Sequence, residues 1–464
     1  MEHLSALDAG FLEAEDADRH VSLAIGGLAI VDGPIPEHDR IIDMLSERVL
    51  SEPRYRQVLR TKPFDLGAPE WVDDPSFNLA HHVRRAALPA PGNEQALVSF
   101  VGDAMRQRLD RDRPLWECWI IEGLAEGRWA VLTKVHHCIA DGISATRMMA
   151  GLCDEGHVSS FADRLRNAEE CTAADDPRSM KDTFRLPLSA LAMPVRLARA
   201  AARSVSGAVE IAAGVMVPGD QTSLNGPITT QRRYAVARVS LSDIATVQRA
   251  LGVTVNDVAL AALSASYRRA LLRRGEQPTP RALRTLVPVS MRRSDTGRTD
   301  NQVSIMLPFL PVDIADPVQR LFAVHDRLSR AKGGGQRQAG KAAVDAVARF
   351  VPFALSAWTI RALTRLPQHG VVALATNVPG PSRPLHLLGR EVVDLLPVPP
   401  IAMQLRTGVA ILSYADTLAF GITGDYDTAA DVDELASGIE DAVDQLVELC
   451  SEHRLVRLVG AASG

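Results

Sequence analysis

This sequence has few cysteines, and no two of them stand in a C-x-x-C pair. Its five cysteines are an odd number in a chain of 464 residues, which is too long to need disulfides for its core. This usage excludes a disulfide-stabilised secreted scaffold and indicates a reducing, cytoplasmic setting. The cysteines are Cys118, Cys138, Cys153, Cys171 and Cys450.

We expect no export signal from this sequence, and it has no long apolar run. Its first 19 residues carry six acidic side chains, whereas a secretory signal has a basic start and an apolar core. The longest stretch without a charged side chain, residues 366–382, contains three prolines. A spanning helix needs about 18 or more mostly apolar residues. We therefore expect any action on lipid to take place from the surface of a membrane or lipid droplet.

Strong net charge is absent as well. The 51 lysines and arginines nearly balance the 56 aspartates and glutamates, for a formal net charge of −5. This balance gives no general attraction to nucleic acid or to an anionic membrane, so any such contact needs a local patch. The 46% hydrophobic and 23% charged composition is that of a globular protein and excludes disorder and collagen-like repeats.

Helix and strand signals alternate in both halves of the chain and predict a mixed α/β fold in two lobes. We expect an N-terminal lobe over 1–153, a linker with crossover helices over 154–225, and a C-terminal lobe over 226–464. The boundary rests on the polar, acidic stretch 154–182, which has few large apolar residues to bury. Strands are predicted over 21–31, 116–121, 129–135, 303–312, 370–376 and 408–413, and helices over 36–50, 94–109, 254–274 and 431–449.

An arginine stripe follows this linker. Within the alanine-rich segment 186–216, Arg196, Arg199 and Arg203 share one helical face. A basic face opposite an apolar one is typical of a helix that lies on a membrane surface. A crossover helix with a solvated arginine stripe explains the same pattern and is the more ordinary interpretation. Both interpretations stay open.

The sharpest chemical signal is the string His-His-Cys-Ile-Ala-Asp-Gly at residues 136–142, where a predicted strand meets a predicted helix. Strand side chains alternate between faces, so only one histidine is expected to face the chemistry. We expect His137 to act as a general base, because imidazole accepts a proton at neutral pH. His136 is then its structural neighbour. For Asp141 the alternatives are to orient the imidazole, to pair with an arginine elsewhere or to cap the helix, and we favour a structural role.

Other chemistries fit these residues poorly. Adjacent strand histidines point apart, so His136, His137 and Asp141 make a poor metal site, and we expect none. The G-x-S-x-G serine motif is absent, and Cys138 is expected to be a buried thiol rather than a nucleophile. A second pair, His81-His82, has no following carboxylate or glycine turn, and we interpret it as structural.

Several separate blocks carry a resemblance that runs nearly end to end. Beside the histidine string, the blocks are Leu4-Ser5-x-Leu7-Asp8, Pro114-Leu115-Trp116, Asn256-Asp257 and Asn377-Val378-Pro379. In these motifs the sequence resembles the bacterial bifunctional wax ester synthases and acyl-CoA:diacylglycerol acyltransferases, most of all the actinobacterial triacylglycerol synthases.

The resemblance implies an α+β sandwich of two lobes, similar to chloramphenicol acetyltransferase and condensation domains, with a tunnel between the lobes. It implies that acyl-CoA and a diacylglycerol or long-chain alcohol meet at His137, with no cofactor. Substrate contacts are expected from Gly142, Asn377, Pro114 and Trp116, and a structural role from Asn256 and Asp257. Asn377, the Gly142 amide and the start of the helix after Asp141 are alternative donors to the oxyanion. For Asp257, a Thr254-x-x-Asp257 capping box is at least as good an explanation as substrate contact.

Two further hypotheses stay open. His136 and Asp141 also fit the H-x-x-x-x-D spacing of glycerol-phosphate acyltransferases, although the Glu-Gly-Thr-like block of those enzymes is absent. A catalytically silent lipid-binding protein of the same fold is the alternative outside enzymes.

Overall fold

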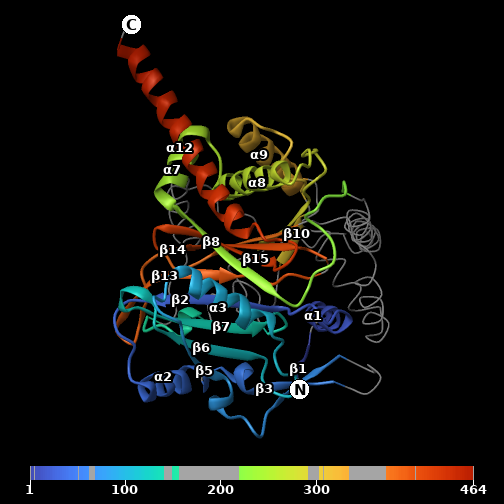
Figure 1. The fold of residues 1–464 in the computed structure, drawn as a ribbon, viewed down its shortest axis with the longest axis vertical. Coiled ribbons are helices and arrows are strands. Elements are labelled where there is room, and N and C mark those ends of the chain that lie inside the picture. The colour runs from blue at the N-terminus through green and yellow to red at the C-terminus, as the bar shows by residue number, and fades with distance from the viewer. Residues whose placement is uncertain are drawn as a thin grey trace, which may run out of the picture.

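The structure, a computed structural model, describes residues 2–4, 6–50, 52–61, 68–139, 149–155, 219–290, 303–306, 308–333, 373–402 and 404–462. Its strands form two six-stranded sheets and one three-stranded sheet. Figure 1 shows the N-terminal half of the chain, blue to cyan, below the C-terminal half, green to red. The two large sheets are called here the N-terminal sheet and the C-terminal sheet.

The N-terminal sheet is completed by a segment from the other end of the chain. Its strand order is β12-β13-β2-β7-β6-β5, and β13 pairs antiparallel with β2. The expected C-terminal lobe, 226–464, therefore contributes two strands to the sheet of the N-terminal half. The bounds are β2 (Ala24–Val31), β5 (Val83–Ala87), β6 (Trp116–Glu122), β7 (Trp129–His136), β12 (His386–Leu387) and β13 (Arg390–Val398).

The C-terminal sheet has the order β10-β9-β11-β14-β15-β8, with β11 parallel to both of its neighbours. Its strands are β8 (Arg232–Ser240), β9 (Thr285–Ser290), β10 (Val303–Met306), β11 (Ala373–Pro379), β14 (Thr407–Tyr414) and β15 (Thr417–Asp425). The small sheet joins β1 (Glu2–His3), β4 (Glu70–Asp73) and β3 (Gln57–Arg60).

Helices cover the two large sheets in layers. Helix α2 (His38–Leu50) packs on one face of the N-terminal sheet, and α1 (Ala6–Ala17) and α3 (Glu94–Arg106) pack on the other. Tyr234 and Ala419 of the C-terminal sheet face this same layer. The opposite face of the C-terminal sheet carries α7 (Leu241–Leu251), α8 (Val255–Arg273), α9 (Pro317–Gly333) and α12 (Val432–Ala462).

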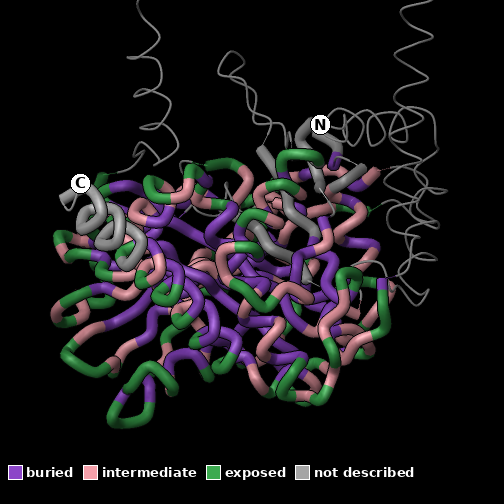
Figure 2. Tube along the Cα trace, turned by 90° about the horizontal axis from the view of Figure 1, so that it is seen from above, coloured by how far each residue is buried: buried purple, intermediate pink, exposed green. Residues whose placement is uncertain are grey.

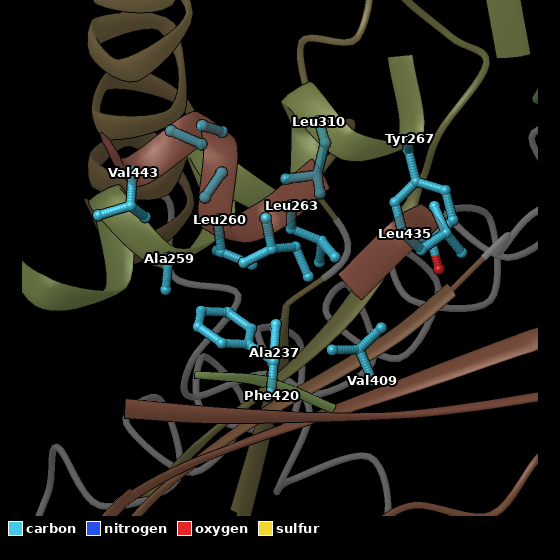
Figure 3. Close-up of a cluster of buried hydrophobic side chains, with 14 of the residues drawn as sticks. Ala237, Ala259, Leu260, Leu263, Tyr267, Leu310, Val409, Phe420, Leu435 and Val443 are labelled. Carbon is cyan, nitrogen blue, oxygen red and sulfur yellow. The ribbon is translucent and has the colours of Figure 1, made fainter. Parts of the chain in front are cut away.

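The largest core lies under these last helices. In Figure 3, Ala237 and Phe420 of the C-terminal sheet face Leu260 and Leu263 of α8 across a continuous apolar layer. The residues of β15 alternate, so Phe420 enters this core while Ala419 faces the helical layer between the sheets. Figure 2 shows buried residues through the interior and exposed ones on the outer loops.

Several predicted elements are confirmed. The strands of the predicted hairpin are β6 and β7, which pair antiparallel. The capping box of α8 is present, because the Asp257 amide donates to the Thr254 hydroxyl and the Thr254 amide donates to the Asp257 carboxylate, at 3.3 and 2.8 Å. Gly275, in the left-handed region at φ 77°, follows this helix as expected.

The strand predicted over 303–312 is shorter, since β10 ends at Met306. Pro308 and Pro311 follow, and proline has no amide hydrogen for a strand ladder. Most of the predicted linker, and the arginine-striped helix over 186–216, lie outside the described residues.

No single helix in the described ranges is both long and apolar enough to cross a membrane. Helices α7 and α8 meet that test only as a pair, and they are bent at 104° to each other.

The two large sheets approach closely at one point. A Cβ atom on Gly421 of β15 would lie 1.6 Å from the carbonyl oxygen of Pro397 in β13, so only glycine fits there. The Tyr234 hydroxyl donates to the same carbonyl at 3.0 Å. This contact therefore helps to set how the two halves sit against each other.

Gly421→Ala is expected to lower the free energy of unfolding by about 1–3 kcal/mol, because the added methyl group meets backbone that cannot move alone. Urea denaturation followed by circular dichroism measures this. Gly151→Ala is the control, since nothing lies within 4 Å of a Cβ atom there. Equal stability of Gly421→Ala and the wild type would contradict the close approach.

Candidate active site

The histidine pair lies at the end of β7, between the ends of two neighbouring strands. His136 is the last residue of β7, and its amide donates to the Leu115 carbonyl at 2.9 Å. On the other side, the His137 amide donates to the Leu23 carbonyl at 3.0 Å, just before β2 begins. The backbone at both histidines is therefore held by neighbouring segments, while their side chains enter different surroundings.

His136 is fully buried, with 1% of its surface exposed. Its Nδ1 accepts a hydrogen bond from the Cys138 amide at 3.2 Å. A ring nitrogen that accepts a hydrogen bond carries no proton, so the proton of the neutral ring is assigned to Nε2. Nε2 in turn lies 3.4 Å from Oε2 of Glu15. His136 is thus assigned to one tautomer, and its buried ring is turned toward Cys138 and Glu15 rather than toward an open site.

Glu15 of α1 is equally buried, at 1% exposure. Its Oε1 accepts a hydrogen bond from the Leu23 amide at 2.9 Å, and its Oε2 pairs with Arg111 at 2.6 Å. Burial alone raises the pKa of this carboxyl, but the hydrogen bonds from His136 and Leu23 and the charge of Arg111 together lower it to about 2. Glu15 is therefore a buried carboxylate at neutral pH.

His137 is half-buried, unlike its neighbour. Its ring stacks on Phe11 of α1, with 4.0 Å between the ring centroids and 27° between the planes. Phe11 packs against a small apolar cluster drawn from both halves of the chain. The cluster is Val21, Leu23, Ile228, Ile401 and Ala402. The His137 ring thus lies where the N-terminal and C-terminal halves meet.

Arginines hold the segment that connects α1 to β2. Arg108 donates to the carbonyls of Val21 at 2.8 Å and Glu15 at 2.5 Å. From the other half, Arg232 of β8 donates to the His20 carbonyl at 2.5 Å. These contacts satisfy carbonyls at and beyond the C-terminal end of α1, and they fix this helix beside the histidine pair.

Trp116 and Pro114 lie in packing rather than in an open site. Trp116 has 1% of its surface exposed, and its indole nitrogen donates to the Tyr55 carbonyl at 2.9 Å. Pro114 is buried, and its carbonyl accepts from the Trp116 amide at 2.8 Å. This placement favours support of the neighbouring strand end over the substrate contact expected from the sequence.

The structural interpretation of the other histidine pair is confirmed for His82. Its ring is buried, stacks on Trp116 at 4.6 Å between centroids, and donates from Nδ1 to the Trp116 carbonyl at 2.9 Å. Burial lowers the pKa of His82. His81 is exposed.

Cys138 is a buried thiol, as predicted, with its pKa raised by burial. A thiol that stays protonated is a poor nucleophile. Among the described residues, no group of three or more His, Cys, Asp or Glu side chains is placed to hold a metal ion.

The structure describes only some of the remaining motif residues. Asp141 and Gly142 lie outside the described residues. Asn377 is in β11, where its backbone is in register with Ile411 of β14. The next residue, Val378, shares a buried cluster with Met149 and Ala150, which follow the histidine string in sequence.

The contacts of Asp257 are structural. Besides capping α8, its buried carboxylate accepts from Nδ1 of His325 at 2.8 Å. Asn256 is exposed at the start of the same helix. This helix lies on the face of the C-terminal sheet opposite to α1, so these contacts do not bring Asn256 or Asp257 to His137.

Two cavities in the described part of the chain, of about 500 and 440 Å³, are not lined by His137. The tunnel implied by the resemblance therefore stays a prediction.

Phe11 and Glu15 were not predicted as site residues. They stand four residues apart on one helix, the spacing that places side chains on the same face. That spacing is visible in the sequence, but nothing local links this face to the histidine string far along the chain.

Comparison with known proteins covers nearly the whole chain. The family described as "Wax ester synthase/diacylglycerol acyltransferase catalytic domain" matches residues 4–259, and "WS/DGAT C-terminal domain" matches residues 299–447. The probable diacylglycerol O-acyltransferase tgs1 of Mycobacterium tuberculosis is 54% identical over 100% of this chain and 99% of its own length. A putative diacylglycerol O-acyltransferase of the same organism is 44% identical over 98% of this chain and 93% of its own.

Solved structures share the fold. The wax ester synthase/diacylglycerol acyltransferase from Marinobacter aquaeolei superposes with a TM-score of 0.66 and 27% identity, covering 97% of this chain and 100% of that one. The first condensation domain of the calcium-dependent antibiotic synthetase gives 0.60 at 15% identity, covering 97% and 96%. The mixed α/β fold predicted from the sequence is thereby confirmed.

The buried Glu15 carboxylate predicts a loss of stability in acid. Because its folded-state pKa of about 2 lies below the ordinary value of 4.5, its contribution is complete above about pH 4.5 and disappears as the pH falls toward 2. The loss is expected to reach roughly 3 kcal/mol. Urea denaturation at several pH values measures it. Glu15→Gln has no group to titrate, so an equal acid loss in this variant would contradict the assignment.

Proposed function

This chain belongs to the wax ester synthase/diacylglycerol acyltransferase family, and we propose that His137 is the general base of its reaction. The protein is a diacylglycerol O-acyltransferase, related over its full length to tgs1 of M. tuberculosis. One observation carries the proposal for His137. Its half-buried ring lies at the junction of the two halves, whereas His136 is committed to Cys138 and Glu15.

The reaction follows from the chemistry of a neutral imidazole. His137 takes the proton from the free hydroxyl of diacylglycerol as that oxygen attacks the thioester carbon of acyl-CoA. The tetrahedral intermediate then collapses, the carbon–sulfur bond breaks, and the proton on His137 passes to the departing CoA thiolate. A thiolate leaves readily because thiol pKa values lie near ~8.5. No acyl-enzyme is required, in agreement with the buried, protonated thiol of Cys138.

The negative charge on the carbonyl oxygen of the intermediate needs hydrogen-bond donors. Asn377, the amide of Gly142 and the start of the helix after Asp141 stay the candidates.

A second acceptor is a long-chain alcohol, which would yield a wax ester. The M. aquaeolei relative is named for both activities, and the same base serves either hydroxyl. Parallel assays with diacylglycerol and hexadecanol distinguish the two acceptors.

We also propose that the protein meets its lipid substrate at a membrane or lipid-droplet surface. Support comes from the sequence pattern of Arg196, Arg199 and Arg203, which lie outside the described residues. A basic helical face attracts anionic lipid headgroups and is screened by salt.

His137→Ala is expected to lower the rate of acyl transfer by about 10² to 10⁴-fold, because the base is lost. Release of free CoA thiol and formation of radiolabelled triacylglycerol measure it. His81→Ala, at an exposed position of the other histidine pair, is the control and should keep full activity. Full activity of His137→Ala would refute the role of this residue. A wild-type protein that releases no CoA with any alcohol would instead favour the silent lipid-binding alternative.

Replacement of Arg196, Arg199 and Arg203 by glutamine is expected to weaken sedimentation with vesicles that contain anionic lipid, and most strongly at low salt. Unchanged sedimentation would leave the ordinary interpretation, a solvated stripe on a crossover helix.

A further inference from the structure

We propose that Glu15 is a positioning residue for His137. Two chains of polar contacts start at its two carboxylate oxygens and end at the backbone amides of His137 and Cys138, which bracket the His137 side chain. The inference rests on the proposed role of His137 as the base.

The first chain runs through the strand end beside the site. Oε1 of Glu15 accepts from the Leu23 amide at 2.9 Å. The carbonyl of the same residue, Leu23, accepts from the amide of His137 at 3.0 Å. Leu23 is therefore held on both sides, and the position of its carbonyl fixes the backbone at which the His137 side chain starts.

The second chain runs through the neighbouring ring. Oε2 of Glu15 faces Nε2 of His136 at 3.4 Å, and Nδ1 of His136 accepts from the Cys138 amide at 3.2 Å. A carboxylate beside Nε2 holds the proton on that nitrogen and leaves Nδ1 free to accept. Glu15 thereby fixes the tautomer of His136 in which Nδ1 accepts the hydrogen bond from the amide of Cys138, the residue after His137.

The carboxylate itself is held in place from a third direction. Arg111, which follows α3, binds Oε2 at 2.6 Å, and Arg108 binds the Glu15 carbonyl at 2.5 Å. One turn earlier on the same helix, Phe11 stacks on the His137 ring. Helix α1 thus fixes the backbone of His137 through Glu15 and packs against its ring through Phe11.

An amide in place of the carboxylate cannot reproduce this pattern. If the oxygen of a glutamine at position 15 accepts from the Leu23 amide, its NH₂ group faces Nε2–H of His136 and the Arg111 guanidinium, which are both donors. If the amide is flipped, the Leu23 amide meets a donor instead. Either orientation leaves buried donors facing each other, which is costly in a sealed site.

Glu15→Gln in the full chain is expected to lower kcat for acyl transfer about 10- to 100-fold, because small displacements of a base carry large rate losses. The KM for acyl-CoA is expected to change less than about twofold, since Glu15 is buried and acts on the base through Leu23 and His136. Rates are compared at a temperature where circular dichroism shows both proteins fully folded.

Asp16→Asn is the matched control. Asp16 is the next residue of α1 and binds the same Arg111 at 3.1 Å, but its side chain is 51% exposed. Its carboxylate binds Arg111 at the surface and not the Leu23 amide, so the kcat of Asp16→Asn should stay within about twofold of the wild type. An unchanged kcat in Glu15→Gln, an equal loss in Asp16→Asn, or a loss confined to KM would overturn the proposal.

A measurement without turnover separates this inference from the proposed function. NMR of protein labelled with ¹⁵N-histidine is expected to show His136 protonated on Nε2 in the wild type and redistributed in Glu15→Gln. A tautomer that is the same in both proteins would overturn the inference, even if the wild type proved inactive and the proposed function failed.

Discussion

The site depends on one buried carboxylate. Glu15 is charged in the interior because an arginine and a backbone amide donate to it and an imidazole nitrogen faces it at 3.4 Å. Each of these partners belongs to a different part of the N-terminal half. Removing any one of them would leave a charge or a donor unsatisfied in a sealed environment. This mutual requirement joins α1, the start of β2 and the end of β7 into one unit, and His137 extends from that unit to the junction of the two halves.

The fold explains why the junction lies where it does. The strand β13 leaves the C-terminal half to complete the N-terminal sheet, and Pro397 within it meets Gly421 and Tyr234 of the C-terminal sheet. Arg232 adds a second link from β8 to the segment after α1. These contacts hold two sheets together around a layer of helices. A substrate that enters between the halves would therefore meet side chains that both halves position.

Sequence reasoning succeeded where neighbours along the chain decide the outcome. The capping box of α8, the hairpin of β6 and β7, and the different surroundings of the two adjacent histidines all follow from local pattern and spacing. It failed where distant segments meet. Nothing near β13 shows that this strand pairs with β2, and nothing near Glu15 shows that its partner is His136. A buried polar contact is visible in sequence only as two polar residues, and burial itself is a property of the packed chain.

The central claim is that His137, held by this unit, takes the proton of the acceptor hydroxyl. A crystal structure with diacylglycerol and a thioether analogue of acyl-CoA, which cannot transfer its chain, tests it most directly. The account predicts a His137 ring nitrogen within about 3 Å of the hydroxyl oxygen, with Glu15 still bonded to Leu23 and facing His136. A hydroxyl bound by another residue, with His137 turned away from both substrates, would contradict it.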